Sequence, residues 1–260
     1  MNFFNSQHRF NIFLLVMTIL AVVVFISLYF VEAGYGMMRN KKWGKTINNK
    51  IGWFLMEIPV FIVMTILWLA SPRRFMITPF IFLIFFQIHY LRRALIFPFL
   101  LKGNGKMPIT IILMGFVFNV CNAIMQGGWI FYLSPIDMYT IDWLLTPQFI
   151  IGTIVYFFGM IVNIQSDKII QNLRGENDNK HYLPEGKFFN YVTSAHYFGE
   201  IVQWIGFAIL TWSISGAVFA LWTFANLVPR ANAIYHKYIK LFGKETIKNR
   251  KLKKVFPFIY

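Results

Sequence analysis

Residues 163–204 read NIQSDKIIQNLRGENDNKHYLPEGKFFNYVTSAHYFGEIVQW, a largely polar segment between two long apolar runs. Asp167 lies near its start and Glu200 near its end, and both acids adjoin or enter those apolar runs. A charged side chain inside a bilayer costs several kcal/mol unless it faces protein or water, so such residues mark candidate functional sites. The segment therefore predicts a site held between two membrane spans.

The composition of the whole chain is typical of a polytopic membrane protein. Of its 260 residues, 57% are hydrophobic and 13% are charged, whereas soluble domains carry roughly 25% charged residues. The length suits about seven spans, at ~20 residues per span plus short loops. We therefore expect an all-α membrane protein with seven transmembrane helices, in which residues 1–260 form one domain.

The net charge of +15 favours a lipid bilayer, and not a nucleic acid, as the partner of this chain. Lys and Arg gather in loops between apolar runs and in the carboxyl-terminal tail, where they mark the cytoplasmic side and contact anionic lipid. The single cysteine, Cys121, can form no intrachain disulfide and has no partner at metal-ligand spacing. We expect no metal, and no obligatory protein partner is evident.

Apolar runs separated by polar connectors predict where the spans lie. They are expected at about 10–31, 51–69, 75–101, 107–133, 143–165, 188–212 and 217–230. Connectors one, three and five and the tail hold most Lys and Arg, which places the amino terminus outside and the carboxyl terminus in the cytoplasm. Arg73 and Arg74, in the second connector, are the exception. The expected location is a bacterial inner membrane or the endoplasmic reticulum, with the site opening to the cytosol.

Three polar side chains lie inside the predicted spans. Glu57 is six residues into its span, or about 9 Å deep at ~1.5 Å per residue. Tyr90 is eleven residues from the cytoplasmic end of the next span, or about 16 Å deep. With Glu200 they could converge in the cytoplasmic half of one cavity. The alternatives are that Glu57 pairs with an arginine such as Arg92 to join two helices, and that Tyr90 fills the core.

Four cations lie at or near the cytoplasmic ends of different spans: Arg93, Lys106, Arg174 and Arg230. Guanidinium and ammonium groups at one level suit a ligand with several phosphates. The chain contains neither a glycine-rich dinucleotide fingerprint nor a P-loop. A nucleotide would therefore have to be held inside the helical bundle.

Several short motifs follow one another along the chain. They are G-Y-G at 34–36, W-F-L-M-E-I-P at 53–59, H-Y-L-R-R at 89–93, N-A-I-M-Q-G at 122–127, N-I-Q-S-D at 163–167, Y-L-P-E-G at 182–186, F-N-Y-V-T-S-A at 189–195, G-E-I-V-Q-W at 199–204, N-L-V-P-R-A at 226–231 and P-F-I-Y at 257–260. In this order and spacing they resemble the steroid 5α-reductase (3-oxo-5α-steroid 4-dehydrogenase) family. The resemblance covers most of the chain.

The resemblance implies a membrane reductase that uses NADPH to reduce the C4–C5 double bond of a 3-oxo-Δ4 steroid, with hydride to C5 and a proton to C4. Glu57 and Tyr90 would be the catalytic pair that polarises the 3-oxo group, since a buried donor stabilises charge developing on that oxygen. Trp53 and Trp204 would wall the steroid. The expected cofactor-binding residues are Tyr35, Arg93, Lys106, Asn163, Asp167, Arg174, His196, Glu200, Arg230 and Tyr238.

Two positions depart from the family pattern, and other functions stay open. His196 stands where the family usually has Asn, and Ile234 and Tyr235 stand where it usually has His, with His236 one residue further on. Both changes touch the expected nicotinamide end. The alternatives are a membrane enoyl reductase of lipid metabolism, an isoprenylcysteine-type methyltransferase, and a proton-coupled carrier that would use the two buried acids as relay groups.

Overall fold

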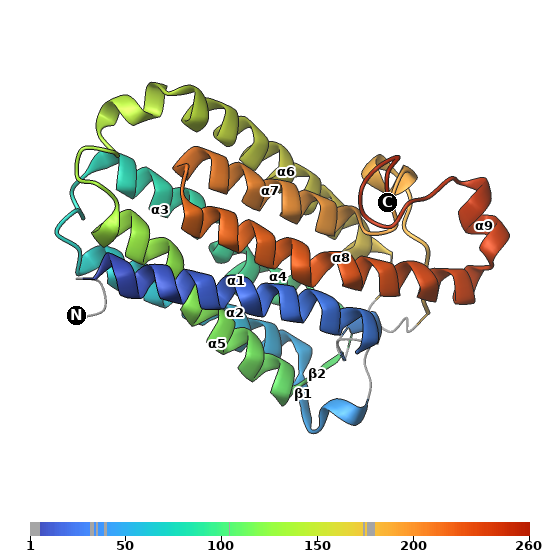
Figure 1. Cartoon of the computed structure of the whole chain (residues 1–260). Coiled ribbons are helices and arrows are strands. Elements are labelled where there is room, and N and C mark those ends of the chain that lie inside the picture. Colours follow the sequence, from blue (N-terminus) through green and yellow to red (C-terminus); the bar gives the residue numbers. More distant parts are fainter. Residues whose placement is uncertain are drawn as a thin grey trace.

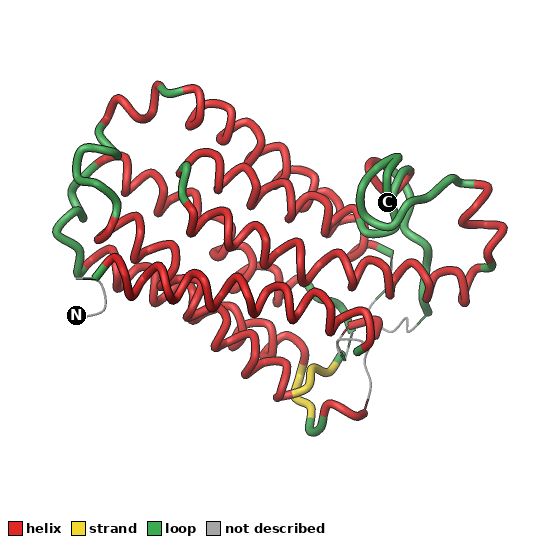
Figure 2. The backbone as a smooth tube through the Cα atoms, in the orientation of Figure 1, coloured by secondary structure: helices red, strands yellow, loops and turns green. Residues whose placement is uncertain are grey.

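The computed structural model describes residues 6–31, 34, 36–38, 41–103, 105–173, 175 and 180–260. Tyr35 and Arg174, two of the expected cofactor ligands, lie outside the described residues. Long helices run side by side in one bundle, and the carboxyl-terminal segment folds back near α9 at one end (Figure 1). Among these residues, the strands lie together at one corner of the helical molecule (Figure 2).

Nine α-helices are found among the described residues: α1 (Gln7–Phe30), α2 (Asn49–Leu69), α3 (Ile77–Tyr90), α4 (Phe97–Leu100), α5 (Ile109–Gly128), α6 (Pro147–Asn172), α7 (Ala195–Thr211), α8 (Ile214–Phe242) and α9 (Lys244–Asn249). Turns of π-helix, at Leu91–Ile96 and Trp129–Leu133, follow α3 and α5. Short 3₁₀ turns lie at Gly36–Met38, Lys41–Trp43, Ile141–Leu145 and Lys187–Asn190. Strands β1 (Thr46–Asn48) and β2 (Lys106–Pro108) pair antiparallel, with Thr46 opposite Pro108.

Within the described residues, five helical segments are long and apolar enough to cross a membrane: Gln7–Phe30, Asn49–Leu69, Ile77–Leu100, Ile109–Leu133 and Pro147–Asn172. The chain is therefore an all-α polytopic membrane protein, as its composition predicts. Two more helices complete the bundle, α7 with 17 residues and α8 with 29.

The helix after the fourth connector begins four residues later than predicted and ends seven residues later. It begins at Pro147, where Thr146 caps it by accepting a hydrogen bond from the Phe149 N–H at 3.3 Å. It ends at Asn172 and not near residue 165, so Asp167 is helical as well as Asn163. Asp167 reads as part of a polar loop after the span, but its side chain is buried and the α-helix continues through it.

The predicted span at 188–212 is wrong at its start, because the α-helix begins only at Ala195. Gly186 has φ +90°, a left-handed conformation that glycine adopts readily, and a 3₁₀ turn follows it. The next residues pair with the chain end: the Thr193 N–H donates to Lys253 O at 2.9 Å, and the Ser194 N–H to Lys254 O at 3.1 Å. The carboxyl-terminal segment therefore braces the approach to α7.

Helices α6 and α7 approach to backbone contact along a row of glycines. Gly152 and Gly159 on α6 face Gly199 and Gly206 on α7, and the glycines of each pair are seven residues apart. A Cβ on Gly206 would lie 2.3 Å from Tyr156 N, so no larger residue fits without moving a helix. Small residues at helix interfaces allow this approach inside membranes. The row fixes α7, and the residues it carries, against α6.

Candidate active site

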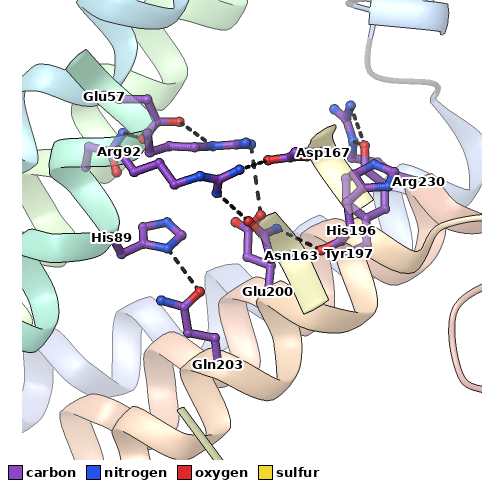
Figure 3. Close-up of polar contacts among 12 residues, drawn as sticks. Glu57, His89, Arg92, Asn163, Asp167, His196, Tyr197, Glu200, Gln203 and Arg230 are labelled. Atoms are coloured by element: carbon purple, nitrogen blue, oxygen red, sulfur yellow. Dashed lines mark hydrogen bonds and ion pairs between the residues drawn. The ribbon is translucent and has the colours of Figure 1, made fainter. Parts of the chain in front are cut away.

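The π-helical turn at Leu91–Ile96 directs two consecutive arginines to different helices. Such a turn inserts an extra residue into a helix and frequently occurs at functional sites. Arg92 reaches α6, whereas Arg93 lies between α2 and α7. Together they join four helices around one buried polar cluster (Figure 3).

Arg92 binds two of the expected cofactor residues. Its Nη1 donates to Asn163 Oδ1 and its Nη2 to Asp167 Oδ2, each at 2.6 Å. Asn163 in turn donates from Nδ2 to the main-chain oxygen of His196 at 2.9 Å. The start of α7 is therefore tied through α6 to the π-helical turn after α3.

Arg93 lies between two acids. Its Nε is 3.9 Å from Glu57 Oε1, and its Nη2 is 4.0 Å from Glu200 Oε2. The guanidinium also lies over the rings of Trp53, at 4.5 Å, and Phe97, at 4.7 Å, and cation–π attraction holds it there. The arginine beside Glu57 is thus Arg93, and not Arg92 as the alternative interpretation suggested.

Glu57 and Tyr90 both face α5, from α2 and α3 respectively. Asn119 Nδ2 donates to Glu57 Oε2 at 3.1 Å, and Asn122 Nδ2 donates to Tyr90 Oη at 3.0 Å. Glu57 is 8% exposed and Tyr90 is 3% exposed, so both side chains point into the bundle and not toward lipid. Since the Tyr90 oxygen accepts from Asn122, its own proton remains to be donated elsewhere.

Trp204 packs beside Tyr90 in an aromatic core. Its ring centroid lies 5.8 Å from that of Tyr90, 4.7 Å from that of His89 and 4.5 Å from that of Phe219. His89 Nδ1 lies 3.2 Å from Gln203 Oε1, a buried contact between α3 and α7. The other predicted wall residue, Trp53, instead lies near Arg93, with its ring 5.4 Å from Phe97. The two tryptophans thus belong to different parts of the cluster.

Arg230, on α8, reaches the start of α7. Its Nε and Nη2 donate to Tyr197 Oη at 3.2 and 3.1 Å. The Tyr197 ring lies 4.0 Å from the ring of His196. Nearby, His196 Nδ1 and Ser194 Oγ are buried atoms without a hydrogen-bond partner in the described part of the chain. This end of the cluster therefore combines a cation with polar atoms that are available to a ligand.

Two of the expected cofactor residues lie apart from these contacts. Lys106 is exposed on β2, opposite Asn48. Tyr238 is buried further along α8, where it packs with Ile247 and Leu252. The structure therefore brings together Glu57, Arg93, Asn163, Asp167, His196, Glu200 and Arg230, with Tyr90, Trp53 and Trp204 beside them.

Sequence reasoning missed Asn119 and Tyr197. Asn119 is a polar residue in a charge-free apolar run, three positions before Asn122, and that spacing puts both on one helix face. This signal was available. Tyr197 lies in a segment rich in aromatic residues, where nothing in the sequence distinguishes it from core.

Comparison with known proteins identifies the class. The family model for 3-oxo-5-alpha-steroid 4-dehydrogenase matches residues 105–260. The chain is 35% identical to steroid 5-alpha-reductase DET2 of Gossypium hirsutum over 272 residues, which covers 98% of this chain and 99% of that one. It is 37% identical to the Arabidopsis thaliana DET2 protein, covering 90% of each chain, and 35% identical to 3-oxo-5-alpha-steroid 4-dehydrogenase 1 of Mus musculus, covering 92% of each.

The chain belongs to the steroid 5α-reductase family. It is thus an oxidoreductase that acts on CH–CH bonds, and it is an integral membrane protein. The resemblance inferred from the motifs is confirmed.

Proposed function

We propose that this protein uses NADPH to reduce the C4–C5 double bond of a 3-oxo-Δ4 steroid. The observation that carries the proposal is the pair of buried side chains, Glu57 and Tyr90, that two different helices present to α5. The names of the relatives from Gossypium hirsutum and Mus musculus support the steroid as substrate.

Tyr90 and Glu57 would act on the 3-oxo group. Negative charge develops on that oxygen as C5 is reduced, and a buried, oriented donor stabilises it. Tyr90 suits this role because Asn122 already donates to its oxygen, which leaves the hydroxyl proton for the substrate. Glu57, as the neutral acid, would donate to the same oxygen from α2, and the enolate left after hydride addition at C5 would then take up a proton from solvent water at C4.

The polar cluster suits nicotinamide adenine dinucleotide phosphate, the proposed cofactor. Guanidinium groups suit phosphates, and Arg93 and Arg230 reach the cluster from separate elements. The unpartnered Ser194 Oγ and His196 Nδ1 suit the polar nicotinamide or ribose groups. Asn163, Asp167 and Glu200 would complete the set from α6 and α7. When bound, NADPH would supply the hydride.

We infer that the bundle crosses the membrane seven times, with α7 and α8 as the last two spans, the amino terminus outside and the site open to the cytosol. The basic residues around α9 support this orientation. Of the two exceptions, Arg74 is exposed, whereas Arg73 is buried and donates to Ser134 and to Tyr132 O, so Arg73 is a structural residue of the turn after α2. Its charge therefore weighs little against the orientation.

The test is NADPH oxidation by purified protein with a panel of steroid enones and enoyl thioesters. We expect a product two hydrogens heavier than the 3-oxo-Δ4 steroid. Glu57→Gln and Tyr90→Phe should each lower kcat by about 100-fold or more, as loss of one donor to a developing oxyanion does. The control is Tyr132→Phe, which removes a hydroxyl that donates to Leu67 O at 2.8 Å outside the cluster.

Two outcomes would contradict the proposal. Full steroid reduction by folded Glu57→Gln and Tyr90→Phe proteins would refute the catalytic pair. Reduction of enoyl thioesters alone would make the chain a membrane enoyl reductase of lipid metabolism.

A further inference from the structure

Asn119 holds Glu57 with an amide whose orientation is fixed. Its Nδ2 donates to the main-chain oxygen of Met56 at 2.7 Å and to Glu57 Oε2 at 3.1 Å. A main-chain carbonyl only accepts hydrogen bonds, so the nitrogen, and not Oδ1, must face α2. Asn119 is buried, with 5% of its surface exposed. The amide therefore presents an N–H group to Glu57 Oε2.

Close approach of α2 and α5 puts this amide in reach. Gly115 precedes Asn119 by one helical turn on α5, and a Cβ on it would lie 2.3 Å from Met56 Cγ. The absent side chain lets the two helices meet at Met56. As a result the short Asn119 side chain spans the gap to the α2 backbone. The packing of α2 against α5 therefore sets the position of the Asn119 side chain.

This arrangement makes the two carboxyl oxygens of Glu57 inequivalent. Oε2 is occupied as an acceptor, which disfavours a proton there, whereas Oε1 lies on the side of Arg93, 3.9 Å from Nε. Tyr90 is held from the same helix, because Asn122 donates to its oxygen and leaves the phenol proton to be donated elsewhere. Asn119 and Asn122 thus orient both members of the pair from one face.

We propose that Asn119 is a positioning residue that holds the Glu57 carboxyl by Oε2 and reserves Oε1 for the reacting substrate. The inference rests on the proposed function, in which Glu57 supports the 3-oxo oxygen. It predicts that Asn119 acts on the reaction only through Glu57.

The first measurement is a double-mutant cycle between the two positions. Asn119→Leu should lower kcat/KM by about 10-fold, as expected for a lost hydrogen bond to a carboxyl group, with the loss in kcat and KM changed less than about twofold. In a Glu57→Leu background the same change should cost less than about threefold. A further loss of about 10-fold there would mean independent action and would overturn the inference. The second variant is Asn119→Ser, whose side chain is too short to reach both Met56 O and Glu57 Oε2.

The matched control is Gln87→Leu. Gln87 makes the same kind of bridge onto α2, with Nε2 donating to Phe61 O at 2.9 Å and to Thr65 Oγ1 at 2.8 Å, but it reaches no carboxyl group. Its removal should lower the melting temperature about as much as Asn119→Leu does. Its effect on kcat/KM should be the same with and without Glu57. Coupling between positions 87 and 57 as large as that between 119 and 57 would refute a specific role.

An infrared measurement separates this inference from the proposed function. The carboxyl band that disappears in Glu57→Gln belongs to Glu57, and Asn119→Leu should shift that band because Oε2 loses its donor. Gln87→Leu should leave it in place. If the wild-type protein reduces no 3-oxo-Δ4 steroid, the proposed function fails, whereas an unshifted band in Asn119→Leu overturns the role of Asn119 in either case.

Discussion

Replacing Gly206 by alanine tests whether backbone contact between α6 and α7 holds the bundle together. The added Cβ would lie 2.3 Å from Tyr156 N and 2.6 Å from Tyr156 Cα. Since non-bonded heavy atoms prefer about 3.5–4.0 Å, the helices would have to separate by about 1 Å. Tyr156 resists that movement because it is fully buried and its hydroxyl donates to Phe85 O at 2.5 Å.

The expected cost follows from two opposing terms. Overpacking a core costs about 1–3 kcal/mol, and a clash with backbone belongs at the upper end because no side chain can turn away. Alanine gains back about 1 kcal/mol of helix propensity over glycine. We therefore expect Gly206→Ala to lose about 2 kcal/mol of stability, or about 4–8 °C in melting temperature for a chain of this size.

Thermal unfolding in detergent measures this effect, with Gly52→Ala as the control. Gly52 is a buried glycine in α2, but a Cβ there would meet only side chains, at 3.1 Å from Ile112 Cδ1 and Met107 Cβ. The Ile112 methyl can turn away and Met107 Cβ has to yield only a few tenths of an ångström, so this variant should melt within about 2 °C of wild type. If Gly206→Ala is as stable as wild type, or if both variants fall equally, backbone contact at the glycines is not what holds α7.

Three further changes probe the contacts around the site. Gly199→Ala would put a Cβ 2.4 Å from Asn163 N; displacing α6 there should weaken NADPH binding by about 10-fold or more in a titration, because small misplacements are costly. Arg92→Leu leaves the buried Asp167 carboxylate without its guanidinium at 2.6 Å and should cost about 3–5 kcal/mol in thermal melts, part of which Arg92→Leu/Asp167→Asn restores. Arg73→Lys loses the planar fork in the turn after α2, so the melting temperature should fall while kcat stays within about twofold.

The class of fold and most spans could be predicted because apolar runs and short basic connectors are local signals. The limits of α6 could not be predicted in this way. The charged pair Asp167 and Lys168 follows the predicted end near residue 165, and charge beyond a span usually indicates a loop. Asp167 nevertheless remains helical, and Arg92 binds it together with Asn163. That partner is over 70 positions away in the sequence. A local pattern carries no information about it.

Which arginine lies beside Glu57 could not be predicted, for a related reason. In a regular α-helix consecutive residues point about 100° apart, and either arginine after Tyr90 could face α2. The π-helical turn at Leu91–Ile96 changes this register, so that Arg93 faces Glu57 and Arg92 faces α6. Nothing in the residue types of that turn indicates a π-helix. The spacing of seven residues between the glycines of α6, and between those of α7, can be read from the sequence. The sequence does not show which helix each pair of glycines packs against.

The contacts divide the site into two ends that rest on different packing. The proposed enone end depends on α2 and α3 against α5, through Asn119 and Asn122. The proposed nicotinamide end depends on α6 against α7, where Asn163 binds the main-chain oxygen of residue 196 and not its side chain. His196 can therefore replace the usual Asn of the family without loss of that hydrogen bond. A change at 196 should then affect cofactor contacts alone, since the orientation of Glu57 and Tyr90 is set by a helix that this hydrogen bond does not touch.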